Sequence, residues 1–102
     1  PSIRDKLDNL DVVVGEWPTR ADLEESGLKD RHQLFGLYQG VPLIDRTHYD
    51  MALPDKITIF QRPIEAACDT KADVVREVRV TVLHEVAHHF GIGDEELGRM
   101  GV

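Results

Sequence analysis

The sequence TKADVVREVRVTVLHEVAHHFGIGD occupies residues 70–94, and its first 21 residues contain neither glycine nor proline. Within it, VRVTV (78–82) alternates like a strand, but the length of the uninterrupted segment favours a helix of about 31 Å at about 1.5 Å per residue. Thr70 followed by Asp73 is typical of a helix N-terminus, and Gly91 is typical of a helix end. We therefore predict one long helix over residues 70–90.

Apolar residues surround most of this predicted helix. Projected at about 100° per residue, they cover more than half of its circumference. We expect such a helix to be central in the fold and mostly buried. The remaining polar sector contains Asp73, Glu77, Thr81, His84 and His88.

The end of the helix carries the pattern HExxH, formed by His84, Glu85 and His88. Side chains at i and i+4 share a face about 6 Å apart along the axis, so the two imidazoles can hold one zinc ion (Zn2+). Glu85 points about 100° away, where it can act as general base on a metal-bound water. Gly91 can adopt a positive φ and turn the chain so that Asp94 supplies a third ligand. The sequence thus predicts zinc with an open fourth position, which is typical of catalytic sites.

Neighbouring residues leave alternatives open. Glu95 or Glu96 could replace Asp94 as ligand, although negative charge at the start of a short last helix is the simpler role for both. We interpret His89 as a hydrogen-bonded histidine in or beside the core rather than a ligand. Cys68, the single cysteine, is interpreted as a packing residue, with an inhibitory zinc thiolate as the alternative.

The rest of the chain contains short apolar runs separated by turns. We predict strands at residues 10–14 (LDVVV) and 56–63 (KITIFQRP), and an edge strand in the extended segment QLFGLY (33–38), which Pro42 keeps out of a sheet centre. Short helices are expected at residues 2–9 and 21–26, the second between Thr19 and Gly27, with turns over 45–55. These elements predict an α+β fold: one domain (1–102) with a small mixed or antiparallel-edged sheet of about three strands packed on the long helix.

Charge and hydropathy narrow the classes of partner. The chain has 19 acidic and 12 basic residues, a net charge of -7, which is the wrong sign for binding phosphate backbones. No apolar run approaches the roughly 20 residues that span a bilayer, and none resembles a secretion signal. We therefore expect no nucleic-acid or membrane partner, and a cytoplasmic location.

Three segments carry a resemblance to a known family. GLYQGVPL (36–43), LPDKITIFQRPIEAAC (53–68) and VRVTVLHEVAHHFGIGDEELGRMG (78–101) are similar to a family of small bacterial zincin-like metallopeptidases, which are minimal, matrix-metalloprotease-like catalytic domains. The motif HExxHxxGxxD resembles zincins with aspartate as third ligand. The resemblance implies a zincin-like fold, zinc ligands at His84, His88 and Asp94, and Glu85 as general base.

The residues and the resemblance together predict a zinc metalloendopeptidase that hydrolyses peptide bonds. A peptide or protein substrate would add as a strand along residues 36–43, the expected edge of the cleft, but the sequence assigns no individual substrate-binding residue. Two alternatives stay open. One is a regulatory HExxH peptidase that cleaves a repressor-like partner and uses a downstream Glu as ligand. The other is a non-catalytic zinc-binding or interaction module.

Overall fold

The computed structural model describes residues 10–40 and 55–100. The helix expected at residues 2–9 and most of the turn-rich segment 45–55, together with Pro42, lie outside the described residues.

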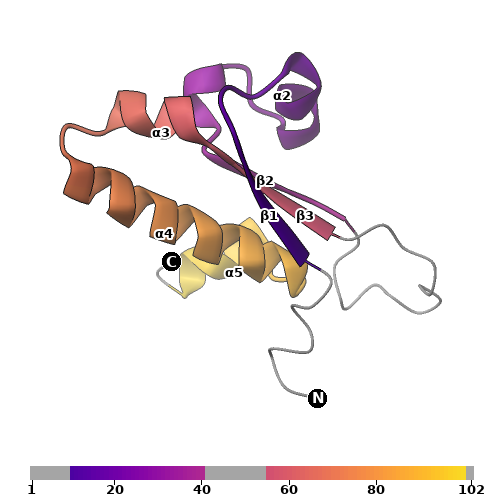
Figure 1. Cartoon of the computed structure of the whole chain (residues 1–102). Helices are drawn as coiled ribbons and strands as arrows, with labels where there is room; N and C mark the ends of the chain where they lie inside the picture. Colours follow the sequence, from indigo (N-terminus) through magenta and orange to yellow (C-terminus); the bar gives the residue numbers. More distant parts are fainter. Residues whose placement is uncertain (1–9, 41–54, 101–102) are drawn as a thin grey trace.

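A mixed sheet of three strands forms the centre of the described structure (Figure 1). The strands are β1 (Leu10–Gly15), β2 (Gly36–Gln39) and β3 (Asp55–Phe60), in the order β1-β3-β2. β1 runs parallel to β3, and β2 runs antiparallel to it. The α+β fold with a small mixed sheet is therefore confirmed, as is the position of β2 at a sheet edge.

The central strand β3 ends earlier than the sequence predicted. Its apolar residues Ile57, Ile59 and Phe60 are buried, but the chain then enters helix α3 (Gln61–Ala67) instead of continuing to residue 63 as a strand. Pro63 is compatible with this helix because the first-turn N–H groups have no partner within a helix, so a proline there removes no bond. The alternating apolar residues before Gln61 favoured a longer strand, so the sequence did not predict the start of α3.

Two shorter elements lie between β1 and β2. Helix α2 (Arg20–Ser26) begins with a capping box between Thr19 and Asp22 and ends at Gly27, whose φ is 79°, as predicted. A 3-10 helix, η1 (Arg31–Gln33), then includes Gln33, the first residue of the segment that we expected to be extended. The prediction is wrong there because the side chain of Asp30 accepts the backbone N–H of His32 and initiates a turn.

The long helix α4 (Lys71–His89) is capped by Thr70, as predicted, and packs on β2 and β3 (Figure 1). It is not mostly buried, however. Val75, Val80 and Leu83 are exposed, and the residues of α4 that are buried are Thr81, Glu85 and His89. The small sheet covers only one side of the helix, so an apolar residue on another side stays in contact with solvent.

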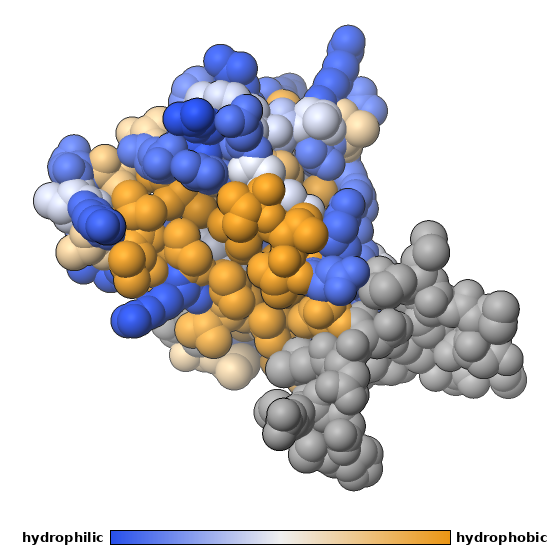
Figure 2. Space-filling view, viewed as in Figure 1, coloured by the Kyte–Doolittle hydropathy of each residue, from blue (hydrophilic) through white to orange (hydrophobic). Residues whose placement is uncertain are grey.

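The apolar core lies between the sheet and α4. Ile57, Ile59 and Ile64 form its buried centre, and partly buried valines of α4 pack against them. Figure 2 shows apolar side chains gathered on the adjoining surface, where Val12 and Val14 of β1 line a hollow of about 320 Å³. In the described part of the chain, no helix is both long and apolar enough to cross a membrane.

Candidate metal centre

The last turns of α4 and the first residue of the next helix bring three candidate ligands together. α4 ends in a Schellman motif, in which Gly91 donates to the carbonyl of His88 and Ile92 donates to that of Ala87. Gly91 has a φ of 86°, as predicted. The chain then reverses into α5 (Asp94–Arg99), the predicted last helix, and Asp94 is its first residue.

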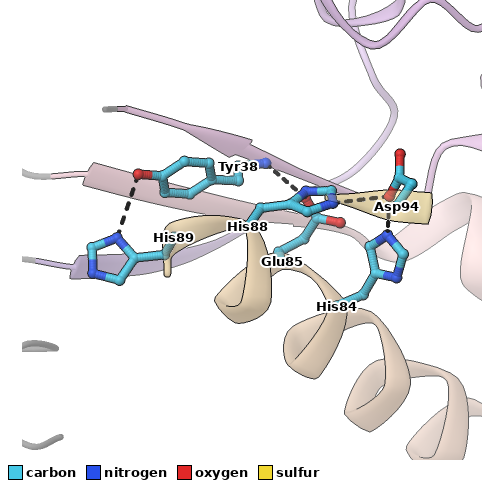
Figure 3. Close-up of polar contacts among 6 residues, drawn as sticks. All are labelled: Tyr38, His84, Glu85, His88, His89 and Asp94. Carbon is cyan, nitrogen blue, oxygen red and sulfur yellow. Dashed lines mark hydrogen bonds and ion pairs between the residues drawn. The ribbon is translucent and has the colours of Figure 1, made fainter. Parts of the chain in front are cut away.

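Asp94 lies against both histidines of the motif (Figure 3). Its Oδ1 atom is 2.7 Å from Nε2 of His84 and 2.9 Å from Nε2 of His88, and the two imidazole centroids are 4.8 Å apart. The hydrogen bonds with His88 and then His84 lower the pKa of Asp94 below its ordinary value. Two ring nitrogens and one carboxylate oxygen thus converge on one point from α4 and α5.

This donor set fits a zinc ion. Imidazole nitrogen and carboxylate oxygen both bind zinc at about 2.0–2.2 Å, so two such atoms on a tetrahedral ion lie about 3.3 Å apart. The observed nitrogen–oxygen separations of 2.7 and 2.9 Å are only about half an ångström shorter. The donor atoms of the two helices thus lie close to the spacing that zinc coordination requires.

Glu85 lies beside these ligands but faces a different side of His88. Ligand atoms of His84, Glu85 and His88 all lie within 4.8 Å of one another, so Glu85 is itself a possible ligand by distance. Its Oε1 atom, however, is 3.3 Å from Nδ1 of His88, whereas the Nε2 atoms of both histidines face Asp94. The convergent set is therefore His84, His88 and Asp94, with the Glu85 carboxylate next to it.

A hydrogen bond from the edge strand holds this carboxylate. The backbone N–H of Tyr38 donates to Oε1 of Glu85 at 2.9 Å, and the Glu85 side chain is only 9% exposed (Figure 3). Gly36 makes this close approach possible. A Cβ atom at Gly36 would lie 2.5 Å from Cγ2 of Thr81 and 3.3 Å from Cγ of Glu85. Sequence reasoning did not find the contact because it depends on the distance between two elements.

A cleft of about 360 Å³ opens over the ligands. The edge strand and the end of α4 form one side, and residues around the end of α2 form the other. Its lining consists of Glu25, Ser26, Leu28, Leu34, Gly36, Leu37, Tyr38, His84, Glu85, His88 and Asp94. The candidate ligands are thus reachable from solvent, and Gly36, Leu37 and Tyr38 of the expected segment 36–43 line the cleft, while residues 41–43 lie outside the described part of the chain.

The remaining sequence candidates have other partners. His89 is fully buried and its Nδ1 lies 2.9 Å from Oδ2 of Asp55, which confirms its interpretation as a hydrogen-bonded core histidine. Cys68 packs against the apolar core, and burial raises the pKa of its thiol. Glu95 pairs with Arg99 at 3.3 Å, and Glu96 is exposed in the first turn of α5.

Comparison with known proteins identifies the family of the chain. The family model of zincin-like metallopeptidases matches residues 7–102, which include every candidate ligand and the whole described sheet. No curated protein matches the chain. Because the match covers nearly all of the sequence, the chain belongs to the zincin-like metallopeptidase family.

Proposed function

We propose that this protein is a zinc-dependent metallopeptidase in which His84, His88 and Asp94 bind the metal and Glu85 is the general base. The observation that carries the proposal is the convergence of Asp94 Oδ1 on both Nε2 atoms, with a buried carboxylate directly beside them. Family membership supports the same chemistry. A zinc ion, when bound, acts as a Lewis acid that polarises a carbonyl and makes water more acidic.

The Glu85 carboxylate is suited to proton transfer. The Tyr38 N–H fixes one of its oxygens, so the side chain is held in one place and loses little conformational entropy on reaction. Glu85 can then take a proton from the water that attacks the scissile carbonyl and give it to the leaving amine. Hydrolysis needs both proton transfers. Glu85 faces the cleft, so this one carboxylate can perform both.

We also propose that the substrate is a peptide or protein segment that adds to the edge of β2. Phe60 donates to the carbonyl of Phe35, and hydrogen-bonded pairs alternate along an antiparallel ladder. Gly36 therefore directs its backbone N–H and carbonyl away from β3, on the side of the cleft, whereas the N–H of Tyr38, which points the same way, is already bound to Glu85. An extended peptide could pair with the backbone groups of Gly36, which would give affinity without a deep pocket.

Zinc analysis and cleavage of an unbiased peptide library by wild type and Glu85→Gln test this function. Glutamine keeps the size of the side chain but cannot accept the proton, so zinc content should be retained while cleavage falls by a factor on the order of 10² or more. Glu65→Gln, on α3, is the matched control and should cleave like wild type. Equal cleavage by wild type and Glu85→Gln would refute the role of Glu85. Zinc binding by wild type with no cleavage of any peptide would favour a non-catalytic zinc module.

A further inference from the structure

A buried polar cluster joins the edge strand to the end of α4. The Tyr38 hydroxyl donates to Oδ2 of Asp55 at 2.6 Å, and Nδ1 of His89 lies 2.9 Å from the same oxygen. Asp55 and His89 are both fully buried. The three residues come from β2, β3 and α4, so the cluster connects all three elements (Figure 3 shows Tyr38 and His89).

We propose that Tyr38, Asp55 and His89 are positioning residues that hold β2 against α4 so that the Tyr38 N–H meets Glu85. Tyr38 takes part in both contacts: its backbone binds the candidate base, and its side chain binds Asp55. The effect on catalysis rests on the proposed function, whereas the effect on the Tyr38–Glu85 contact does not.

The fold explains why β2 needs such a cluster. β2 has four residues and pairs on one side only, with β3. Its contact with α4 runs along the stripe Thr81, Glu85 and His89, whose spacing of four residues keeps them on one face of the helix. At the Thr81 end, Gly36 permits close packing. At the His89 end, the polar cluster supplies directional hydrogen bonds. Glu85 lies between the Gly36 contact and this cluster.

The burial of Asp55 makes the geometry well defined. A carboxyl group without contact to water needs donors around it, and each donor has a preferred direction. The hydroxyl of Tyr38 and the ring of His89 both approach Oδ2, which fixes the two side chains relative to each other. The chain also passes close to Asp55 just after β2. A Cβ atom at Gly40 would clash with Oδ1 of Asp55, so there is no room for a side chain at this position.

Amide hydrogen exchange of the metal-free protein tests the proposal directly. Tyr38→Phe removes one hydroxyl and keeps the backbone N–H. The amide of residue 38 bonds to Glu85, while that of Leu37 lies in the ladder with Thr58 and serves as an internal reference. We expect exchange at residue 38 to accelerate about tenfold more than at residue 37. Equal acceleration at both positions would overturn the proposal, because it would show a general loss of stability only.

Two further comparisons complete the test. Ile64→Val removes a buried methyl group from the apolar core, and it should accelerate both amides equally. His89→Asn keeps a donor near the Nδ1 position, whereas His89→Ala removes it, so only the alanine variant should lose protection at residue 38. Equal protection in the two His89 variants would contradict the proposal. In the zinc-loaded protein, Tyr38→Phe should lower kcat with little change in KM, and a change in KM alone would refute the positioning role.

Discussion

Gly36→Ala tests the close approach of the edge strand to α4. The backbone of Gly36 does not require glycine, since its φ is outside the left-handed region. The restriction comes from the neighbouring helix, because the added Cβ would lie 2.5 Å from Cγ2 of Thr81 and 3.3 Å from Cγ of Glu85. Either the strand or the helix must move, and Glu85 is at the point of contact.

The expected cost follows from overpacking. Thr81 is 7% exposed and cannot rotate into solvent without leaving its site, so we expect Gly36→Ala to lower the free energy of unfolding by about 1–3 kcal/mol. Thr81→Ser removes the methyl group in the way and should itself cost about 0.8 kcal/mol. In the double variant the 2.5 Å contact is absent and only the milder contact with Glu85 remains, which predicts a favourable coupling of about 1–2 kcal/mol.

Urea denaturation of the metal-free proteins measures the cost of Gly36→Ala, the cost of Thr81→Ser and the coupling between them. Gly98→Ala is the matched control, because a Cβ there meets nothing within 4 Å and alanine should stabilise α5 by about 0.5–1 kcal/mol. If Gly36→Ala proves as stable as wild type, or if it costs the same in the presence of Thr81→Ser, then β2 does not lie on α4 as described. The reasoning about Glu85 would then be wrong as well.

Four other outcomes are expected. Asp94→Ala should weaken zinc binding by a factor on the order of 10² in competition with a chromophoric chelator, while Glu95→Ala should not; the opposite result would make Glu95 the ligand. Gly91→Val opposes the φ of 86°, so zinc affinity should fall about tenfold while helical circular dichroism is retained, and unchanged affinity would exclude a role for the turn. The pKa of Asp94 is lowered in the folded protein by His88 and His84, so its contribution to metal-free stability is present above the unfolded pKa and is lost as pH falls through the folded one. Asp94→Asn should therefore flatten the acid side of the stability profile, and identical profiles would contradict this. Chelation of zinc should loosen α5 and leave the sheet folded.

Local sequence signals predicted the parts of the site that lie within one stretch of chain. The cap at Thr70, the spacing of His84 and His88, and the turn at Gly91 are properties of adjacent residues, so they can be inferred without knowing the rest of the fold. Asp94 follows from the same reasoning, because a short reversal after Gly91 leaves few places for its side chain. This explains why the convergence of the three groups could be anticipated.

Contacts between distant segments could not be predicted in the same way. Helical projection placed Thr81 in the polar sector with the histidines, but Thr81 is buried together with Glu85 and His89, which lie four and eight residues further along α4. Its partners are a glycine, a backbone N–H and a buried aspartate from β2 and β3. The apolar pattern correctly placed Val78, Val82 and Val86 against the core, but periodicity measures apolar character and could not reveal this polar interface.

The position of the ligands determines how metal removal should act. His84 and His88 belong to α4, which the apolar core holds independently through Ile57, Ile59 and Ile64. Asp94 belongs to α5, a helix of six residues in which Leu97 is the buried side chain. A helix shorter than about 12–15 residues is marginal alone, so α5 depends on its tertiary contacts.

An ion bound by both helices therefore adds its binding free energy mainly to the attachment of α5. On chelation we expect amide exchange in α5 to accelerate strongly, while the amides of β3 change little and the melting temperature falls without loss of the folded state. Hydrogen exchange with and without chelator distinguishes the two regions. If the β3 amides lose protection together with those of α5, the metal holds the whole domain, as it does in a zinc finger, and the apolar core does not suffice to fold the chain.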